Sequence, residues 1–244
     1  MLGSDLVQYL GAEFHVTAIH KENYHTHAGG FFDIVLNANG NSKRFWANQN
    51  PLDDFIASTV SVYQSIIDFP SDLYIYISSP DVYENHEDAE HTKENNQIIP
   101  ENLSPYGLHK YLSELIVKKH KEKFLILRHS MILGSNLKKG PFYDIIHGNP
   151  LFITLKSRLQ LITTQVIAEI IITLLKNSVT NEIINIGGEG NLAFTKIREY
   201  YDHEIEISKE AETQIYEMNV EKIKHLYPAL KTSEQYFEEF LKGL

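Results

Sequence analysis

The sequence contains no cysteine and no surplus of basic residues, and both shortages exclude classes of protein. Without cysteine there is no disulfide, no thiolate zinc site and no cysteine nucleophile. The 22 lysines and arginines stand against 32 aspartates and glutamates, which gives a formal net charge of −10 at pH 7. Because an acidic surface repels phosphate groups, we expect neither nucleic acid nor an anionic membrane as the main partner.

A long apolar run is also lacking. The most apolar stretch, residues 159–175, is interrupted by Gln160, Gln165 and Glu169, whereas a membrane-spanning helix needs about 20 apolar residues. We therefore expect a buried amphipathic helix in this stretch. Near the N-terminus, Asp5 precedes any apolar run and no basic leader is present. This pattern does not fit a secretory signal, so the expected compartment is the cytoplasm.

Short apolar runs rich in β-branched and aromatic residues alternate with helix-length segments along the chain of 244 residues. Strands are predicted at residues 14–19, 32–36, 73–77, 124–127 and 182–186, and helices at residues 2–10, 51–69, 105–121 and 164–177. This alternation predicts a doubly wound α/β fold with a parallel sheet, in which ligands bind beyond the carboxyl ends of the strands. The alternation becomes irregular from about residue 135, so we expect a domain at 1–134 and a smaller lobe at 135–244.

Three polar side chains are placed for acid–base chemistry. Ser104 and Pro105 are good start signals for a helix, and on that helix Tyr106 and Lys110 lie four residues apart on one face. An adjacent ammonium group lowers the pKa of a phenol, which then serves as an acid or base near neutral pH. Ser79, which follows the strand at 73–77, brings a hydroxyl group to the start of this helix. Without Ser79, a surface pair on an amphipathic helix would be the better interpretation.

The surrounding sequence supports the catalytic interpretation. Residues 77–83 read Ile-Ser-Ser-Pro-Asp-Val-Tyr, and residues 105–110 read Pro-Tyr-Gly-Leu-His-Lys, followed by Glu114. Together with Arg128 and Gly134, these residues resemble the extended short-chain dehydrogenase/reductase superfamily, in particular the NAD-dependent epimerase/dehydratase family that modifies nucleotide sugars. The resemblance implies a Rossmann-like NAD(P)-binding domain at 1–134 and a substrate-binding lobe at 135–244.

The resemblance also implies roles for individual residues. Tyr106 would be the general acid/base, Lys110 would hold the nicotinamide ribose, and Ser79 would hydrogen-bond the reacting sugar oxygen while hydride passes to or from NAD or NADP. The implied cofactor-binding residues are Gly3, His20, Lys21, Ala38, Asn39, Tyr106 and Lys110. His20 and Lys21 stand where NAD-binding members carry an acidic residue, which favours NADP. Asp81 is a candidate auxiliary acid, and Arg44 is one of several cations available to a diphosphate.

The chain departs from the family pattern at its N-terminus. Gly3 matches the third glycine of the phosphate-binding turn Gly-x-x-Gly-x-x-Gly, and the first strand and the first two glycines are missing. We expect that the chain is truncated there. The predicted function is an NAD(P)-dependent epimerase or reductase acting on a nucleotide-activated sugar. Dehydration is less favoured, because Pro80 and Asp81 replace the Asp-Glu pair of the family's dehydratases. The alternative is a non-catalytic binding or scaffold protein of the same fold.

Two further expectations concern partners and metals. Family members often pair through two helices, which predicts a homodimer through residues 51–69 and 105–121. His20, His25 and His27 lie close in sequence, but no carboxylate completes a site, so we expect no bound metal.

Overall fold

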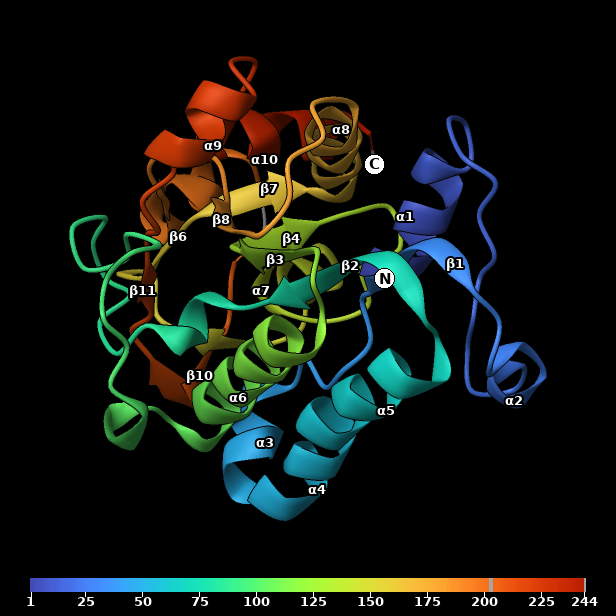
Figure 1. Ribbon diagram of the computed structural model, residues 1–244. Helices are drawn as coiled ribbons and strands as arrows, with labels where there is room; N and C mark the ends of the chain where they lie inside the picture. Colours follow the sequence, from blue (N-terminus) through green and yellow to red (C-terminus); the bar gives the residue numbers. More distant parts are fainter. Residues whose placement is uncertain (202–203, 244) are drawn as a thin grey trace.

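The structure, a computed structural model, describes residues 1–201 and 204–243 (Figure 1). Its centre is a parallel four-stranded sheet in the order β1-β2-β3-β8. The strands are β1 (Phe32–Asn37), β2 (Ser71–Ser78), β3 (Phe124–His129) and β8 (Glu182–Ile186). Ile75 of β2 pairs with Leu125 of β3, and Leu127 pairs with Ile184 of β8. Four of the five predicted strands are therefore present and share one sheet.

Helices cover both faces of this sheet, as Figure 1 shows. Because side chains alternate along a strand, Tyr74 and Tyr76 of β2 pack on one face, with α5 (Ser61–Asp68) and α6 (Pro105–His120). Ile75 packs on the other face, with α1 (Leu2–Leu10) and α8 (Thr164–Lys176). This layering confirms the predicted doubly wound α/β fold.

Helix α6 begins where its sequence predicts. The hydroxyl group of Ser104 accepts a hydrogen bond from the backbone N–H of Gly107 (3.2 Å), and Pro105 occupies the first helical turn. This cap fixes the start of the helix that carries Tyr106 and Lys110.

The predicted helix at 51–69 contains a turn of a different kind. Between α4 (Pro51–Phe55) and α5 the backbone forms a π-helical turn, η1 (Ile56–Val60). A π turn holds more residues than an α-helical turn and is often found at functional sites. Asp54 of α4 and Ser58 of η1 are both buried beside it.

The strand predicted at residues 14–19 is wrong. This segment runs from α1 toward α2 (Tyr24–His27) without joining the sheet (Figure 1). The Asn23 side chain, in place of a neighbouring strand, bonds backbone groups at the end of this segment. Its Nδ2 donates to the carbonyl of Ala18 (2.9 Å), and its Oδ1 accepts from the N–H of His20 (2.7 Å). The apolar residue Val16 packs against the core without a strand ladder. An apolar residue of this segment thus packs against the core, although the segment pairs with no strand that the structure describes.

The C-terminal part forms three small sheets, with strand orders β4-β7, β10-β5 and β11-β6-β9. A second apolar cluster, which includes Phe142, Phe194 and Phe237, lies among them. The strands are β4 (Met131–Leu133), β5 (Leu151–Ile153), β6 (Arg158–Leu159), β7 (Leu161–Thr163), β9 (Leu192–Ala193), β10 (Ile207–Glu212) and β11 (Ile215–Tyr216). The remaining helices are α3 (Arg44–Gln49), η2 (Pro80–Val82), η3 (Pro100–Asn102), α7 (Pro141–Ile146), η4 (Phe194–Glu199), α9 (Glu221–Leu226) and α10 (Ser233–Lys242). The domain boundary at 134/135 stays a prediction.

Within the described ranges, no helix combines the length and the apolar character needed to cross a membrane.

Candidate active site

Ser79 lies where β2 ends and the short helix η2 begins. Its extended backbone makes it the N-cap of η2, and Pro80 follows in the first helical position. The Ser79 hydroxyl donates a hydrogen bond to Asp81 Oδ2 (2.8 Å), and the backbone N–H of Asp81 donates back to the Ser79 oxygen (3.3 Å). The cap therefore aims a serine hydroxyl and a carboxylate at the carboxyl end of the central sheet, where ligands bind in such folds.

Tyr106 lies in the first turn of α6 and is buried. Burial raises the pKa of its phenol well above the usual 10, the Asp81 carboxylate raises it further, and a hydrogen bond with Ser79 lowers it. The sequence-based prediction that Lys110 would bring this pKa down is therefore wrong for the protein as it stands, because burial and Asp81 raise the pKa and Lys110 is not among the main groups that influence it. The phenol is protonated at neutral pH and is poised to donate a proton.

Gly107 explains how η2 and α6 come together. A Cβ atom at this position would lie 2.1 Å from the carbonyl oxygen of Asp81, far inside any real contact. The missing side chain lets the backbone of η2 press against α6 next to Tyr106. The glycine of the Tyr-Gly pair thus sets the distance between the serine–aspartate cap and the tyrosine.

Lys110 lies one turn further along α6 and is also buried. Its Nζ donates a hydrogen bond to the carbonyl of Ile77 (3.4 Å) and lies 5.4 Å from the centre of the Tyr76 ring. Burial lowers the pKa of this lysine from 10.5 to about 8, against the opposing influence of Asp54, Glu114 and Asp81. Since about 8 is still above neutral pH, Lys110 remains a cation there.

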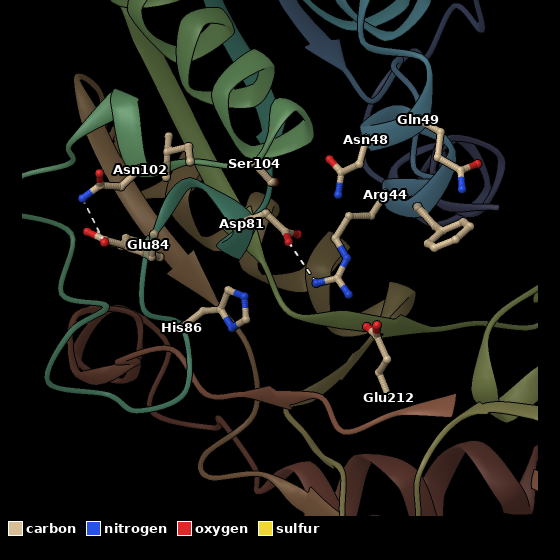
Figure 2. Close-up of a pocket in the computed structure, with 12 residues that line it drawn as sticks. Arg44, Asn48, Gln49, Asp81, Glu84, His86, Asn102, Ser104 and Glu212 are labelled. Atoms are coloured by element: carbon tan, nitrogen blue, oxygen red, sulfur yellow. Dashed lines mark hydrogen bonds and ion pairs between the residues drawn. The ribbon is translucent and has the colours of Figure 1, made fainter. Parts of the chain in front are cut away.

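A cavity of about 460 Å³ opens next to Asp81 and Asn48, within the size range of small-molecule sites. Ser79 and Tyr106 do not line it but bond residues that do, since Ser79 bonds Asp81 and the Tyr106 N–H bonds Asn48. Its lining residues are Arg44, Phe45, Asn48, Gln49, Asp81, Tyr83, Glu84, His86, Asn102, Leu103, Ser104 and Glu212. Figure 2 shows Arg44 reaching from α3 toward Asp81, with Nη1 3.3 Å from Oδ1. Glu212 of β10 approaches the same space from the C-terminal lobe.

Tyr216 of β11 completes the wall next to this ion pair. Its hydroxyl donates to Asp81 Oδ1 (3.0 Å), the Arg44 guanidinium lies 5.4 Å from its ring centre, and His86 stacks on its ring at 4.0 Å. Asp81 thus accepts hydrogen bonds from Ser79, Arg44 and Tyr216, which come from three separate segments. The sequence offered Asp81 and Arg44 as candidates but gave no signal for Tyr216 or His86, because only the tertiary fold brings β11 to this place.

The predicted cofactor-binding residues fall into two groups. Gly3 of α1 and Ala38, just after β1, lie together, since a Cβ on Gly3 would stand 3.9 Å from the Ala38 Cβ. Asn39 is exposed next to them, and its N–H donates to Asn37 Oδ1 (2.9 Å). His20 and Lys21 are exposed in the turn before α2, and nothing described in the structure ties their side chains to the first group.

The loop after β1 passes next to Lys110, where the family resemblance implies a dinucleotide. Gly40 adopts a φ of +124°, and a Cβ there would lie 3.4 Å from Lys110 Nζ. This region of backbone conformation favours glycine, so the loop keeps the space in front of the ammonium group free of a side chain. Lys110 would hold the ribose hydroxyls of the cofactor in that space, and Gly3 and Ala38 would contact the part of the cofactor nearest α1.

Comparisons with known proteins identify the family of this chain. The model of the NAD dependent epimerase/dehydratase family matches residues 1–187. A search of curated proteins found no matching sequence.

Among solved structures, this chain is similar to a UDP-galactose 4-epimerase (TM-score 0.75, 18% identity, covering 100% of this chain and 96% of that one). It is also similar to dTDP-4-dehydrorhamnose reductase from Bacillus anthracis str. Ames in complex with NADP (TM-score 0.77, 15% identity, 100% and 95% covered). A third is UDP-glucuronic acid 4-epimerase from Bacillus cereus with UDP-glucuronic acid and NAD (TM-score 0.66, 18% identity, 87% and 76% covered). At these identities the structures establish a shared Rossmann-type fold. Together with the family match over residues 1–187, they show that this chain belongs to the NAD-dependent epimerase/dehydratase family.

Proposed function

We propose that this protein is an NAD(P)-dependent epimerase or reductase that acts on a nucleotide-activated sugar, with Ser79, Tyr106 and Lys110 as its catalytic residues. The observation that carries the proposal is the grouping of the Ser79 hydroxyl and the protonated Tyr106 phenol at the carboxyl end of the sheet, with the buried Lys110 one turn below. A cavity of 460 Å³ adjoins this group through Asp81. Glu212 lines the cavity and Tyr216 bonds Asp81 at its edge, which supports a substrate-binding role for residues 135–244.

The chemistry assigned to each residue follows from its surroundings. NAD(P), when bound, supplies or accepts the hydride. In the reductive direction Tyr106 donates its phenolic proton to the carbonyl oxygen of the sugar, and Lys110 stabilises the phenolate that results. Ser79 turns its hydroxyl from Asp81 to the same carbonyl oxygen. In the oxidative direction the phenolate takes the proton back from the sugar hydroxyl.

The first test replaces the proton donor. Tyr106→Phe should lower kcat by at least about 100-fold, because general acid–base catalysis contributes on the order of 10²–10⁴-fold. With a panel of UDP- and dTDP-sugars, reductase turnover is followed by the absorbance of NADH or NADPH, and epimerase turnover, which consumes no cofactor, by chromatography of the two epimers. Tyr111→Phe, on the same helix and half-buried, is the control and should keep its activity. Equal turnover in the wild type and Tyr106→Phe would reject the proposed role.

We also propose NADP as the preferred cofactor; this rests on the family resemblance, which places the positively charged pair His20 and Lys21 where an acidic residue would favour NAD, and not on a contact in this structure. Fluorescence titration should give a lower Kd for NADPH than for NADH. Lys21→Ala should reduce that preference about tenfold, the effect of losing ~1.4 kcal/mol of binding free energy. Lys118→Ala, exposed on α6, is the matched control. Equal affinity for both cofactors in the wild type would refute the preference.

The second candidate is a non-catalytic binding protein. Two contacts favour it: the hydrogen bond of Ser79 to Asp81 and the ion pair of Arg44 with Asp81. Because of these contacts, Ser79 and Asp81 have hydrogen-bonding partners without a substrate. Micromolar binding of a nucleotide sugar with no turnover under any cofactor condition would support this candidate over the enzyme.

A homodimer is proposed through the outer face of α4, η1 and α5. Leu52, Ile56, Val60, Tyr63 and Ile67 are exposed there at helical spacing. Light scattering should give twice the chain mass, and Ile56→Glu should give the monomer. Phe152→Glu, which changes an exposed apolar residue on β5, should leave the mass unchanged. A monomeric wild type at micromolar concentration would rule this arrangement out.

A further inference from the structure

The Asp54 side chain has no solvent exposure and lies on α4, next to the helix that carries Tyr106 and Lys110. Its Oδ1 accepts hydrogen bonds from Asn41 Nδ2 (2.9 Å) and from the Ser58 hydroxyl (3.2 Å), and its Oδ2 lies 2.7 Å from His109 Nδ1. Burying a carboxylate is costly unless it is well hydrogen-bonded. The hydrogen bonds to both oxygens of the buried Asp54 carboxylate indicate that it has a specific role in this part of the fold.

The partners of Asp54 come from the elements that surround Lys110. Asn41 belongs to the loop after β1, directly beside Gly40, whose missing Cβ leaves space at the Lys110 ammonium. His109 precedes Lys110 on α6. The Ser58 hydroxyl lies 3.9 Å from the same Gly40 Cβ position, so the partners of Asp54 lie on three elements next to the lysine.

We propose that Asp54 is a positioning residue which keeps Lys110 protonated and holds the Gly40 loop against it; this rests on the proposed role of Lys110. The proposal assigns no contact with the substrate to Asp54. It acts through the charge and the placement of the lysine.

Other charged groups also face Lys110, and they differ from Asp54 in their partners. Glu114, on the same helix, is bonded to Arg128, and Asp81, on η2, is bonded to Arg44. An arginine offsets the charge of each of these two carboxylates. Their pull on the lysine is reduced accordingly.

Asp54 is bonded to two neutral side chains and to His109, and no arginine contacts it among the described residues. Lys110 also lies near the half-buried His129 of β3 and the ring of Tyr76. Burial lowers the pKa of His129 to about 4, so this histidine is neutral at pH 7. Asp54 is therefore the main source of negative charge for the lysine.

The direction of the effect follows from these charges. Burial lowers the pKa of Lys110 to about 8, and the Asp54 carboxylate is the strongest influence that raises it. Neutralising Asp54 lowers the pKa further, so that the lysine loses its proton closer to neutral pH. Asp54 and Lys110 form no direct ion pair, so we expect a pKa shift near the lower end of the roughly 1–3 units that an opposite charge within about 4–6 Å produces.

The test is Asp54→Asn, with Asp53→Asn as the matched control, because Asp53 is the neighbouring aspartate on α4 and is exposed. In the full chain labelled with ¹⁵N-lysine, the Lys110 Nζ resonance is assigned by its loss in Lys110→Met and titrated by NMR. We expect Asp54→Asn to lower the Lys110 pKa by about one unit or more, and Asp53→Asn to leave it unchanged. An unchanged Lys110 titration in folded Asp54→Asn would overturn the proposal.

Two additions keep the result decisive. If Asp54→Asn does not fold, Asp54→Ser, which leaves room for a water molecule, is titrated in a stabilising osmolyte under the same criterion. In an active enzyme, the alkaline limb of kcat/KM should move to lower pH in Asp54→Asn by the same amount as the NMR titration. A failure of the proposed function would appear as inactive wild type, whereas a failure of the Asp54 proposal would appear as an unmoved lysine resonance.

Discussion

The two arginine–carboxylate pairs near the carboxyl end of the sheet differ in almost every physical respect. Arg128 contacts Glu114 twice, at 2.6 Å and 2.9 Å, and the two side chains are 2% and 1% exposed. Arg44 contacts Asp81 once, at 3.3 Å, and the side chains are 33% and 12% exposed. The first pair is closed to solvent, while the second faces a cavity.

The surroundings of the two pairs explain the contrast. Glu114 also accepts a hydrogen bond from the Ser78 hydroxyl (2.5 Å), and Arg128 donates one to the Tyr83 hydroxyl (2.8 Å). This network joins β2, α6 and β3 below the site and leaves no polar group free to meet a ligand. Asp81 and Arg44 both line the cavity and share one contact of 3.3 Å, so the arginine is able to turn to an incoming group. One pair stabilises the scaffold, and the other is available for recognition.

The largest effect is expected from breaking the buried pair. Arg128→Met leaves the Glu114 carboxylate buried without its partner, which should cost roughly 3–5 kcal/mol in the free energy of unfolding. Urea unfolding followed by circular dichroism measures this loss. The double variant Arg128→Met/Glu114→Leu removes both charges and should recover most of the stability. A single variant as stable as the wild type would show that the buried pair is not a structural element.

An intermediate effect is expected where the scaffold meets the cavity. Gly107→Ala puts a Cβ atom where the Asp81 carbonyl now lies, and such overpacking should cost about 1–3 kcal/mol. Because Asp81 must move, kcat should fall as well. Gly3→Ala on α1 is the control, since its Cβ would meet Ala38 at an ordinary 3.9 Å. If both alanine variants unfold at the same urea concentration, η2 does not pack against α6 as described.

The smallest effect on stability is expected at the exposed pair. Arg44→Gln should change the free energy of unfolding by less than about 1 kcal/mol, as for other partly exposed ion pairs. If the arginine meets the substrate, KM should rise while kcat changes little. Isothermal unfolding and steady-state kinetics on the same preparation separate the two quantities. A loss of stability comparable to that of Arg128→Met would show that the two pairs contribute equally to the free energy of unfolding.

Local sequence signals predicted most of the sheet and the start of α6. Ser104 and Pro105 mark a helix through side-chain and backbone chemistry that needs no tertiary partner. The strand predicted at residues 14–19 failed because a short apolar run does not show which backbone, if any, a segment pairs with. Phe14, His15 and Thr17 are exposed, and Val16 packs against the core.

The site was predicted in part. Ser79, Tyr106 and Lys110 were found through their spacing, and the structure gathers them at one end of the sheet; their catalytic roles stay a prediction. Tyr216 was missed because it bonds Asp81 across 135 positions of sequence. The direction of the Tyr106 pKa was missed for a similar reason, since desolvation arises from packing that no spacing encodes.

The π-helical turn at Ile56–Val60 sets how far α4 is rotated about the helix axis relative to α5. Each residue of an α-helix advances by about 100° around the axis, so deleting one residue from this turn and restoring regular α-helix would rotate α4 by about that angle relative to α5. Asp54 would then swing away from His109 and Asn41 and toward another face of the helix. A single inserted residue thus keeps the carboxylate in register with the lysine, and the length of this turn is constrained as tightly as the identity of any side chain around it.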